Sequence, residues 1–130
     1  MCNSIRGIAY FSSSFAGIFD VQCILAGRIL EHASGPLKNK YLKPLIAGKI
    51  VDSFATSEPE TSSDLSLHAL KTIGEESRNE IVDSGIKRWI TNAPVAKFVV
   101  FLCRVGDQTR MLLVDLDAEG VTVEENQTKN

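Results

Sequence analysis

Two polar segments of this 130-residue sequence carry side chains that could bind a ligand. The first, Thr56-Ser57-Glu58-Pro59, is followed closely by Ser62-Ser63-Asp64 and comes directly after a predicted strand. Small hydroxyl groups and a rigid proline at the end of a strand can present several hydrogen-bond donors to a ligand. The second segment, residues 85–92, holds the only tryptophan, Trp89, beside Thr91. A tryptophan at the end of a strand can serve as a platform for a planar ligand.

Each of these patterns also has a simpler structural explanation. Serine, aspartate and glutamate at this spacing are common in turns and caps, and a tryptophan packs in a core more often than it faces a ligand. Lys87 and Arg88 could neutralise a phosphate, but such a pair more often lies on a solvated strand face. The sequence holds no recognisable nucleophile–base pair, phosphate-binding loop or metal-ligand set. Taken singly, none of the patterns identifies a function.

Helical periodicity precedes both segments. Apolar residues between Phe15 and Leu30 recur every three to four positions, which predicts a helix with a buried start within residues 8–19. Pro36 suits the first turn of a second amphipathic helix, which Gly48 ends. Pro44 should kink this second helix or shorten it.

Beyond Gly48 the apolar period changes to two, as strands require. Residues 98–102 are apolar on both faces, which predicts a central strand that is covered on both sides. Helices followed by strands predict an α+β fold, with a helical segment over 1–48 and an antiparallel, barrel-like β domain over 49–130. Short strands are predicted over residues 50–55, 67–73, 80–84, 86–91, 97–104, 110–115 and 121–124, with a turn at 74–77.

Composition narrows the class of protein. The chain is 44% hydrophobic and 23% charged, with a net charge of −2, which fits a globular protein and argues against a disordered chain or a nucleic-acid-binding domain. Three isolated cysteines suggest neither a zinc site nor a disulfide framework, so we expect a cytoplasmic setting. The apolar run at residues 8–19 is interrupted by serines and is too short to span a bilayer, so no membrane is expected.

Taken together and in order, the motifs resemble those of the acyl-CoA dehydrogenase family. That family has the pattern [ST]-E-P-x-x-G-S-D, followed downstream by N-G-x-K-x-W-I-T-N. Here Ser57-Glu58-Pro59 and Ser63-Asp64 match the first pattern, and Trp89-Ile90-Thr91-Asn92 matches the second. Residues 40–48 resemble the family's K-Y-L-P-x-L-A-x-G stretch, and residues 117–123 its D-x-P-G-V-x-V segment. The resemblance extends from residue 15 to residue 124.

The resemblance implies an FAD-dependent oxidoreductase that acts on CH–CH groups of acyl thioesters. In that family a glutamate takes the α-proton and the β-hydrogen leaves as hydride to FAD. The resemblance places Ser57 at the pyrimidine edge of the flavin, Trp89 against the ring system and Thr91 near N5. It places Ser63 near the flavin phosphates or the pantetheine arm of the substrate. The residues expected to bind FAD are Phe54, Ser57, Ser62, Ser63, Trp89, Ile90 and Thr91.

The expected partners follow from the same resemblance. They are an acyl-CoA or acyl-carrier-protein thioester, an electron-transfer acceptor and further copies of the chain in a homo-oligomer. The family's catalytic glutamate belongs to a C-terminal helical bundle, which has no counterpart before Asn130. We therefore expect a truncated chain that is inactive by itself, and no residue here is named as the catalytic base.

Three departures from the family pattern leave alternatives open. Ser62 stands where the family has glycine, Glu60-Thr61 replaces a pair of small residues, and Ser84 replaces asparagine. A side chain at residue 62 would hinder a close approach of the backbone to a pyrophosphate. The alternatives are a non-catalytic β domain that serves as a binding or assembly module, and a relative that uses the scaffold for flavin-dependent oxygenation.

Overall fold

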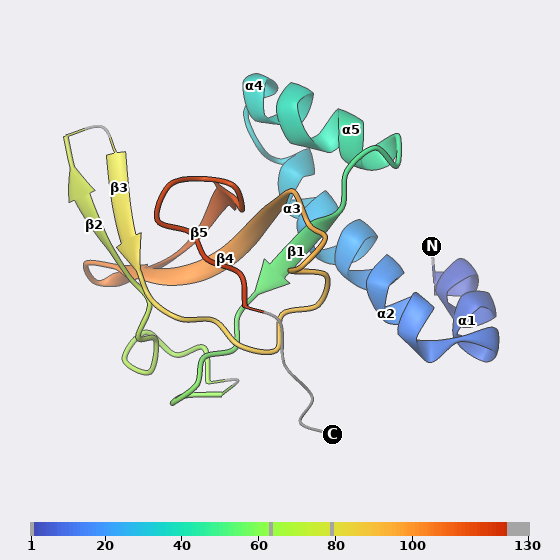
Figure 1. Ribbon diagram of the computed structural model, residues 1–130, viewed down its shortest axis with the longest axis horizontal. Coiled ribbons are helices and arrows are strands. Elements are labelled where there is room, and N and C mark those ends of the chain that lie inside the picture. The colour runs from blue at the N-terminus through green and yellow to red at the C-terminus, as the bar shows by residue number, and fades with distance from the viewer. Residues whose placement is uncertain (1, 63, 79, 125–130) are drawn as a thin grey trace.

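The computed structural model describes residues 2–62, 64–78 and 80–124, in which helices come first and strands second (Figure 1). This order confirms the α+β layout predicted from the change of period. The helical segments are α1 (Cys2–Phe11), α2 (Ser13–Asp20), η1 (Val21–Ala26), α3 (Gly27–Glu31), α4 (Gly35–Leu37), η2 (Lys38–Leu42) and α5 (Lys43–Ile46), where η1 and η2 are π-helical.

α2, η1 and α3 form one continuous helix. Ser12 caps its start by accepting a hydrogen bond from the backbone N–H of Phe15. Gly27 follows the π-helical turn because a Cβ there would lie 2.8 Å from the carbonyl oxygen of Gln22. The prediction that this helix starts in a buried position is wrong, since Phe15 is 59% exposed and α1 precedes it.

α4, η2 and α5 form the second helix, which runs through Pro44. The ring of Pro44 removes one N–H from the helical ladder, and the preceding turn is π-helical, with the backbone N–H of Lys43 bonded to the carbonyl of Lys38. Pro44 therefore marks the change from π-helix to α-helix and does not break the helix.

The five strands within the described residues form one mixed sheet. Its hydrogen-bonded order is β1-β4-β2-β3, and β5 pairs with the other edge of β4. β1 and β2 both run parallel to β4, one beside each half of it, whereas β5 and β3 are antiparallel to their neighbours. The bounds are β1 (Asp52–Ala55), β2 (Ile73–Ser77), β3 (Glu80–Ser84), β4 (Phe98–Val105) and β5 (Gln108–Asp115).

The predicted sheet was wrong in two respects. The sheet is mixed and not antiparallel, because β1 and β2 run parallel to β4, and it does not close into a barrel. Residues 67–71, 86–91 and 121–124 do not form strands, whereas the predicted turn at 74–77 lies within β2. The segment at β2 is polar, but Gly74 packs so tightly that a Cβ there would lie 2.9 Å from Ile81 and from Val105. The close packing of a glycine leaves no alternation of apolar residues in the sequence, so this strand was predicted as a turn.

β4 is the centre of the core, as its two apolar faces predicted. Phe98 and Val100 face the helices, and the helices contribute Ala26, Leu30 and Tyr41 to this cluster. The ring of Tyr41 contacts that of Phe98 at a centroid distance of 4.8 Å. The alternate residues of β4 build a second cluster on the other face, which includes Ala55, Val99, Phe101, Cys103 and Val105. The helices therefore cover one face of the sheet, and loops close the other.

Candidate functional site

The two polar segments of the sequence lie side by side in the structure. The backbone N–H of Arg88 donates a hydrogen bond of 2.9 Å to the carbonyl of Ser57. The hydroxyl of Ser53 donates to the carbonyl of Thr91 at 2.7 Å, and the side-chain amide of Asn92 donates to the carbonyl of Asp52. Residues 85–92, although not a strand, therefore run along β1 and the loop after it. The resemblance places Ser57, Trp89 and Thr91 on one flavin, which requires the two segments to meet in space, and the structure confirms that they do.

Glu58 is the residue that connects the segments around this surface. It is only 3% exposed, and both of its carboxylate oxygens accept hydrogen bonds. One oxygen accepts from the ammonium of Lys87 at 2.8 Å and from the backbone N–H and hydroxyl of Thr72. The other accepts from the backbone N–H of Lys71 at 2.7 Å and from the hydroxyl of Thr61. One carboxylate thus ties its own loop both to the chain that enters β2 and to the segment that carries Trp89.

Burial and hydrogen bonding act on this carboxylate in opposite directions. Burial raises the pKa of Glu58, but the hydrogen bonds from Lys87, Thr72 and Lys71 outweigh burial and lower the pKa to about 2. Glu58 is therefore an anchor that stays ionised. The side chain of Lys87 is only 12% exposed, so the interpretation of Lys87 as part of a solvated strand face or a phosphate site is wrong.

Trp89 differs from an ordinary core tryptophan. Its side chain is 72% exposed, and its backbone φ of +60° lies in the left-handed region that non-glycine residues rarely adopt. Asn92 shares this conformation with a φ of +68°. The guanidinium of Arg88 lies 5.8 Å from the centre of the Trp89 ring. An exposed aromatic ring on a strained backbone fits a binding surface better than a packing role, because such strain concentrates at functional positions.

The other residues expected at the site differ in their surroundings. Thr91 is exposed, and Ser57 is half-buried directly after β1. Among the described residues, neither hydroxyl forms a hydrogen bond, which leaves both free to donate to a ligand. Ile90 packs against the cluster on the loop-covered face of the sheet, and Phe54 packs against the helix-facing cluster. The side chains of Ile90 and Phe54 therefore pack on opposite faces of the sheet.

Ser62 keeps the backbone conformation that glycine favours. Its φ is +54°, and it closes a tight turn with two backbone hydrogen bonds between Glu58 and Ser62. A serine in this conformation is strained by its Cβ. The expected contact residue Ser63 lies outside the described residues.

Asp52 is a buried polar residue that the sequence analysis did not single out. It is fully buried in β1, and neither carboxylate oxygen has a hydrogen-bond partner among the described residues. Burial raises the pKa of Asp52 to about 6. The nearby helix segment η1 presents Cys23, and Asp52 adds to the effect of burial in raising the pKa of that thiol. In the sequence, Asp52 falls on the same strand face as Ile50 and Phe54, and this pattern does not show that the carboxylate is buried without a partner.

Comparison with known proteins gives consistent results. Residues 53–130 match the family model for the acyl-CoA dehydrogenase middle domain. The chain is 30% identical over 125 residues to benzylmalonyl-CoA dehydrogenase from Aromatoleum aromaticum, which covers 94% of this chain and 33% of that protein. The chain is also 30% identical over 80 residues to an L-prolyl-[peptidyl-carrier protein] dehydrogenase from a Serratia strain. This match covers 61% of this chain and 20% of that protein.

A solved structure shows the same fold. The crystal structure of a glutaryl-CoA dehydrogenase from Mycobacterium smegmatis, in complex with FADH2, superposes with a TM-score of 0.80 at 27% identity. The superposition covers 90% of this chain and 30% of that chain. These two relatives match most of this chain, but the chain spans only about a third of their length.

Proposed function

The chain belongs to the acyl-CoA dehydrogenase family, and we propose that residues 54–57 and 86–92 form its part of an FAD site. In this proposal the 130 residues supply the middle domain of the family together with the helices that precede it. The whole protein is then an oxidoreductase that acts on CH–CH groups of an acyl thioester, carried either by coenzyme A or by a carrier protein.

The chemistry of the surface supports a flavin as its ligand. FAD would supply the acceptor for the hydride that leaves the β-carbon of the substrate. The hydroxyl of Ser57 would donate to the pyrimidine edge of a bound flavin, and the hydroxyl of Thr91 would donate near its N5. Fixed donors at these positions stabilise the negative charge of a reduced flavin. The exposed ring of Trp89 would cover apolar surface of the bound ring system.

The single observation that carries the proposal is the convergence of Ser57 with the segment of Trp89. The hydrogen bond between the carbonyl of Ser57 and the N–H of Arg88 holds free hydroxyls and an exposed aromatic ring on adjoining backbone. Residues distant in sequence reach this arrangement only in the folded chain. The family motif and the local geometry are two separate observations that support the same surface as the flavin site.

No catalytic base is proposed among the described residues. Glu58 is the buried carboxylate of the motif, but five donors surround it and its pKa of about 2 makes it a weak base. Removal of an α-proton needs a base whose pKa matches the task and which can reach the carbon that is deprotonated. We therefore expect the 130-residue chain to bind flavin without dehydrogenating a substrate.

A non-catalytic binding or assembly module is the second candidate, and Ser62 is the observation that favours it. Ser62 adopts a left-handed φ with a side chain present, and exposed Glu60 adds a negative charge to the same loop. Both features would weaken the approach of a pyrophosphate. If FAD fails to bind the folded chain at any concentration that its solubility allows, this second function is the better explanation.

The test is a titration of the purified chain with FAD, followed by flavin fluorescence. We expect Trp89→Ala to weaken the affinity about tenfold, as loss of one aromatic contact would, and Ser57→Ala to weaken it less. Ser77→Ala, in exposed β2, is the matched control and should leave the affinity unchanged. Binding that is insensitive to both site variants would contradict the assignment.

A second measurement addresses catalysis. The chain, FAD and a series of acyl-CoA substrates are mixed without oxygen, and the flavin absorbance is followed. We expect no bleaching within minutes. Stoichiometric bleaching would mean that a base exists within this chain, and Glu58→Gln would be the first variant to examine.

A further inference from the structure

The ammonium group of Lys87 binds the chain on both sides of Ser57. It donates a hydrogen bond of 2.8 Å to the carboxylate of Glu58 and a longer one, of 3.4 Å, to the carbonyl oxygen of Thr56. The next residue along the chain, Arg88, donates its backbone N–H to the carbonyl of Ser57 at 2.9 Å. Three consecutive residues at the end of β1 are therefore each held by Lys87 or by its neighbour.

The same lysine begins a segment whose backbone is strained. Trp89 has a φ of +60° and Asn92 a φ of +68°, and residues other than glycine keep such angles only where their surroundings fix them. The far end of the segment is held by β1. The hydroxyl of Ser53 donates to the carbonyl of Thr91 at 2.7 Å, and the side-chain amide of Asn92 also donates to the backbone of β1. At the near end, the side chain that holds the segment is that of Lys87.

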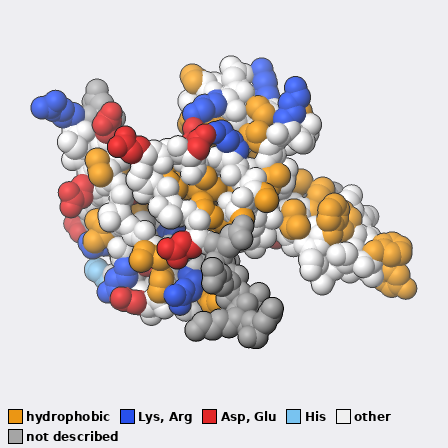
Figure 2. All heavy atoms as spheres, in the orientation of Figure 1, with side chains coloured by type: hydrophobic (Ala, Val, Ile, Leu, Met, Phe, Trp, Pro, Cys, Tyr) orange, Lys and Arg blue, Asp and Glu red, His pale blue; other side chains and the backbone are white. Residues whose placement is uncertain are grey.

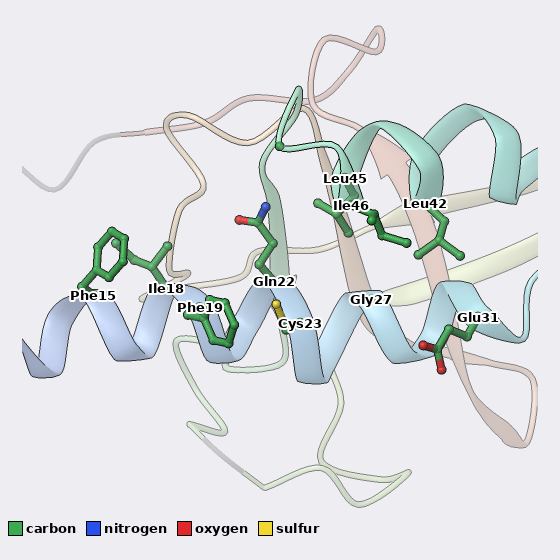
Figure 3. A pocket seen from close by; sticks show the side chains of 11 residues that line it. Phe15, Ile18, Phe19, Gln22, Cys23, Gly27, Glu31, Leu42, Leu45 and Ile46 are labelled. Carbon is green, nitrogen blue, oxygen red and sulfur yellow. The ribbon is translucent and has the colours of Figure 1, made fainter. Parts of the chain in front are cut away.

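The ion pair between Lys87 and Glu58 is enclosed by the chain itself, which distinguishes it from the apolar surfaces of the helices. Figure 2 shows hydrophobic side chains along α1 and α2, and Figure 3 shows a pocket of about 510 Å³ between the continuous helix and α5. Both of these features lie open at the surface. The side chains of Lys87 and Glu58, in contrast, are 12% and 1% exposed. Their contacts therefore do not depend on what packs against the outside of the chain.

We propose that Lys87, through its ion pair with Glu58, is a positioning residue that sets the affinity of this surface for flavin. The pair fixes the start of the strained segment, so that the ring of Trp89 and the hydroxyl of Ser57 reach one flavin at the same time. Lys87 and Glu58 act from below the surface, because their charged groups are directed at each other. This inference rests on the proposed function, since flavin is the ligand that the surface is proposed to bind.

The expected contribution of this buried ion pair is geometric. The loss of water by both charges offsets much of their attraction, so replacement of both by neutral groups can leave stability almost unchanged. Their hydrogen bonds nevertheless restrict how the two segments pack. Glu58 also accepts from the backbone N–H groups of Lys71 and Thr72, which hold the carboxylate independently of Lys87. The segment that carries Trp89 is thus bound to a carboxylate whose position is already fixed.

The first experiment measures amide hydrogen exchange by nuclear magnetic resonance, without flavin. Lys87→Met leaves the charge of Glu58 buried without an opposite charge, so a second variant combines it with Glu58→Gln and removes both charges. In both variants we expect the N–H of Arg88 to exchange at least about tenfold faster than in the parent chain. The amides of β4 should keep the parent rates in the double variant. Their rates therefore report whether a change is local or general.

The matched control is Lys71→Met. It removes the side chain of an exposed lysine next to the same carboxylate, and within the described residues that side chain forms no ion pair. The backbone N–H that Lys71 donates to Glu58 is retained. Exchange at Arg88 should stay within about twofold of the parent rate.

The second experiment is a double-mutant cycle on the affinity for FAD, measured by fluorescence titration. Lys87→Met with Glu58→Gln should weaken binding to the parent chain about tenfold, as much as loss of the Trp89 ring, because the ring is no longer held in place. In the Trp89→Ala chain the same two changes should weaken binding about threefold or less, since only Ser57 is left to be displaced. Lys71→Met should change neither affinity by more than about twofold.

The results separate the positioning role from general stability and from the flavin site itself. Exchange at Arg88 that stays at the parent rate would overturn the role of Lys87, and so would equally faster exchange at Arg88 and throughout β4 of the double variant. An equal loss of FAD affinity with and without Trp89, or no loss at all, would overturn it too. If the parent chain binds no FAD, the proposed function fails, and the exchange at Arg88 then decides by itself whether Lys87 holds the segment.

Discussion

Replacing Glu58 by glutamine should remove a large part of the stability of the loop between β1 and β2. Burial raises the pKa of Glu58, but hydrogen bonds from Lys87 and Thr72 outweigh it and lower the pKa from 4.5 to about 2. Since each pKa unit corresponds to about 1.4 kcal/mol, the ionised carboxylate contributes about 3 kcal/mol to folding. Glutamine also places an amide donor opposite donors that need an acceptor, because both oxygens of Glu58 only accept.

The pH dependence gives this prediction a definite sign. The pKa of Glu58 is lower in the folded chain than in the unfolded chain, so the unfolded chain binds the proton more readily. The stabilisation is therefore fully present above about pH 4.5 and is lost as the pH falls through about 2. Glu58→Gln should lack this acid-dependent loss and should be less stable than the parent chain by about 3 kcal/mol at neutral pH.

Urea unfolding followed by far-ultraviolet circular dichroism between pH 2 and pH 7 measures both effects. Glu60→Gln is the matched control, because Glu60 is an exposed carboxylate in the same loop, and it should change stability by less than about 0.5 kcal/mol. Lys87→Met in the Glu58→Gln background should cost less than it does alone, since no buried charge is left unpaired. The reasoning is refuted if Glu58→Gln retains the stability and the acid transition of the parent chain.

The remaining predictions concern three other residues. Burial raises the pKa of Asp52 to about 6, so the folded chain holds the proton more tightly than the unfolded chain, and stability falls as the pH rises from about 4 to about 6. Asp52→Asn should abolish this fall and stabilise the chain at pH 7 by up to about 3 kcal/mol, measured by urea unfolding. An unchanged slope of stability against pH in the variant would count against this prediction. Ser62→Gly should raise the midpoint of thermal unfolding and increase the free energy of unfolding by about 0.5–1 kcal/mol, because glycine has no Cβ to be strained at a φ of +54°. A lower midpoint would exclude strain at this position. Trp89→Gly should leave the free energy of unfolding unchanged or slightly higher, since the ring is exposed and glycine relieves the strain of the left-handed backbone. A loss of stability above about 1 kcal/mol would show that the ring packs against the rest of the chain.

The order of helices and strands and the central position of β4 followed from local patterns. Period and apolar character report burial directly, so a strand covered on both sides, such as Phe98–Val105, is visible in the sequence. The mixed pairing was not predictable in the same way, because parallel pairing of β1 with β4 depends on how the intervening chain returns. β2 was mistaken for a turn, since Gly74 is selected by close packing and not by hydrophobicity.

For the site, the motifs predicted which segments meet, but not how they are held. The meeting of Ser57 with residues 86–92 was expected because the family resemblance places both on one flavin. The burial of Lys87 was not, because a lysine next to an arginine normally indicates a solvated surface. The burial of Asp52 was not predicted either, because a carboxylate is rarely fully buried without a partner. Buried charges violate the statistical rule on which such assignments depend.

The position of Glu58 explains why a Glu-Pro turn and a lysine-tryptophan segment occur together in one chain. The carboxylate fixes Lys87, and the next residues along the chain carry Arg88, which bonds to Ser57, and the exposed Trp89. Loss of either charge would leave the other buried without an opposite charge beside it, so the two residues stabilise each other and hold the surface between them. A carboxylate used in this way is unsuited to proton transfer, since the donors that position it also keep its pKa low. In this chain the acidic residue of the motif therefore builds the proposed flavin surface, and any proton abstraction has to come from a different group.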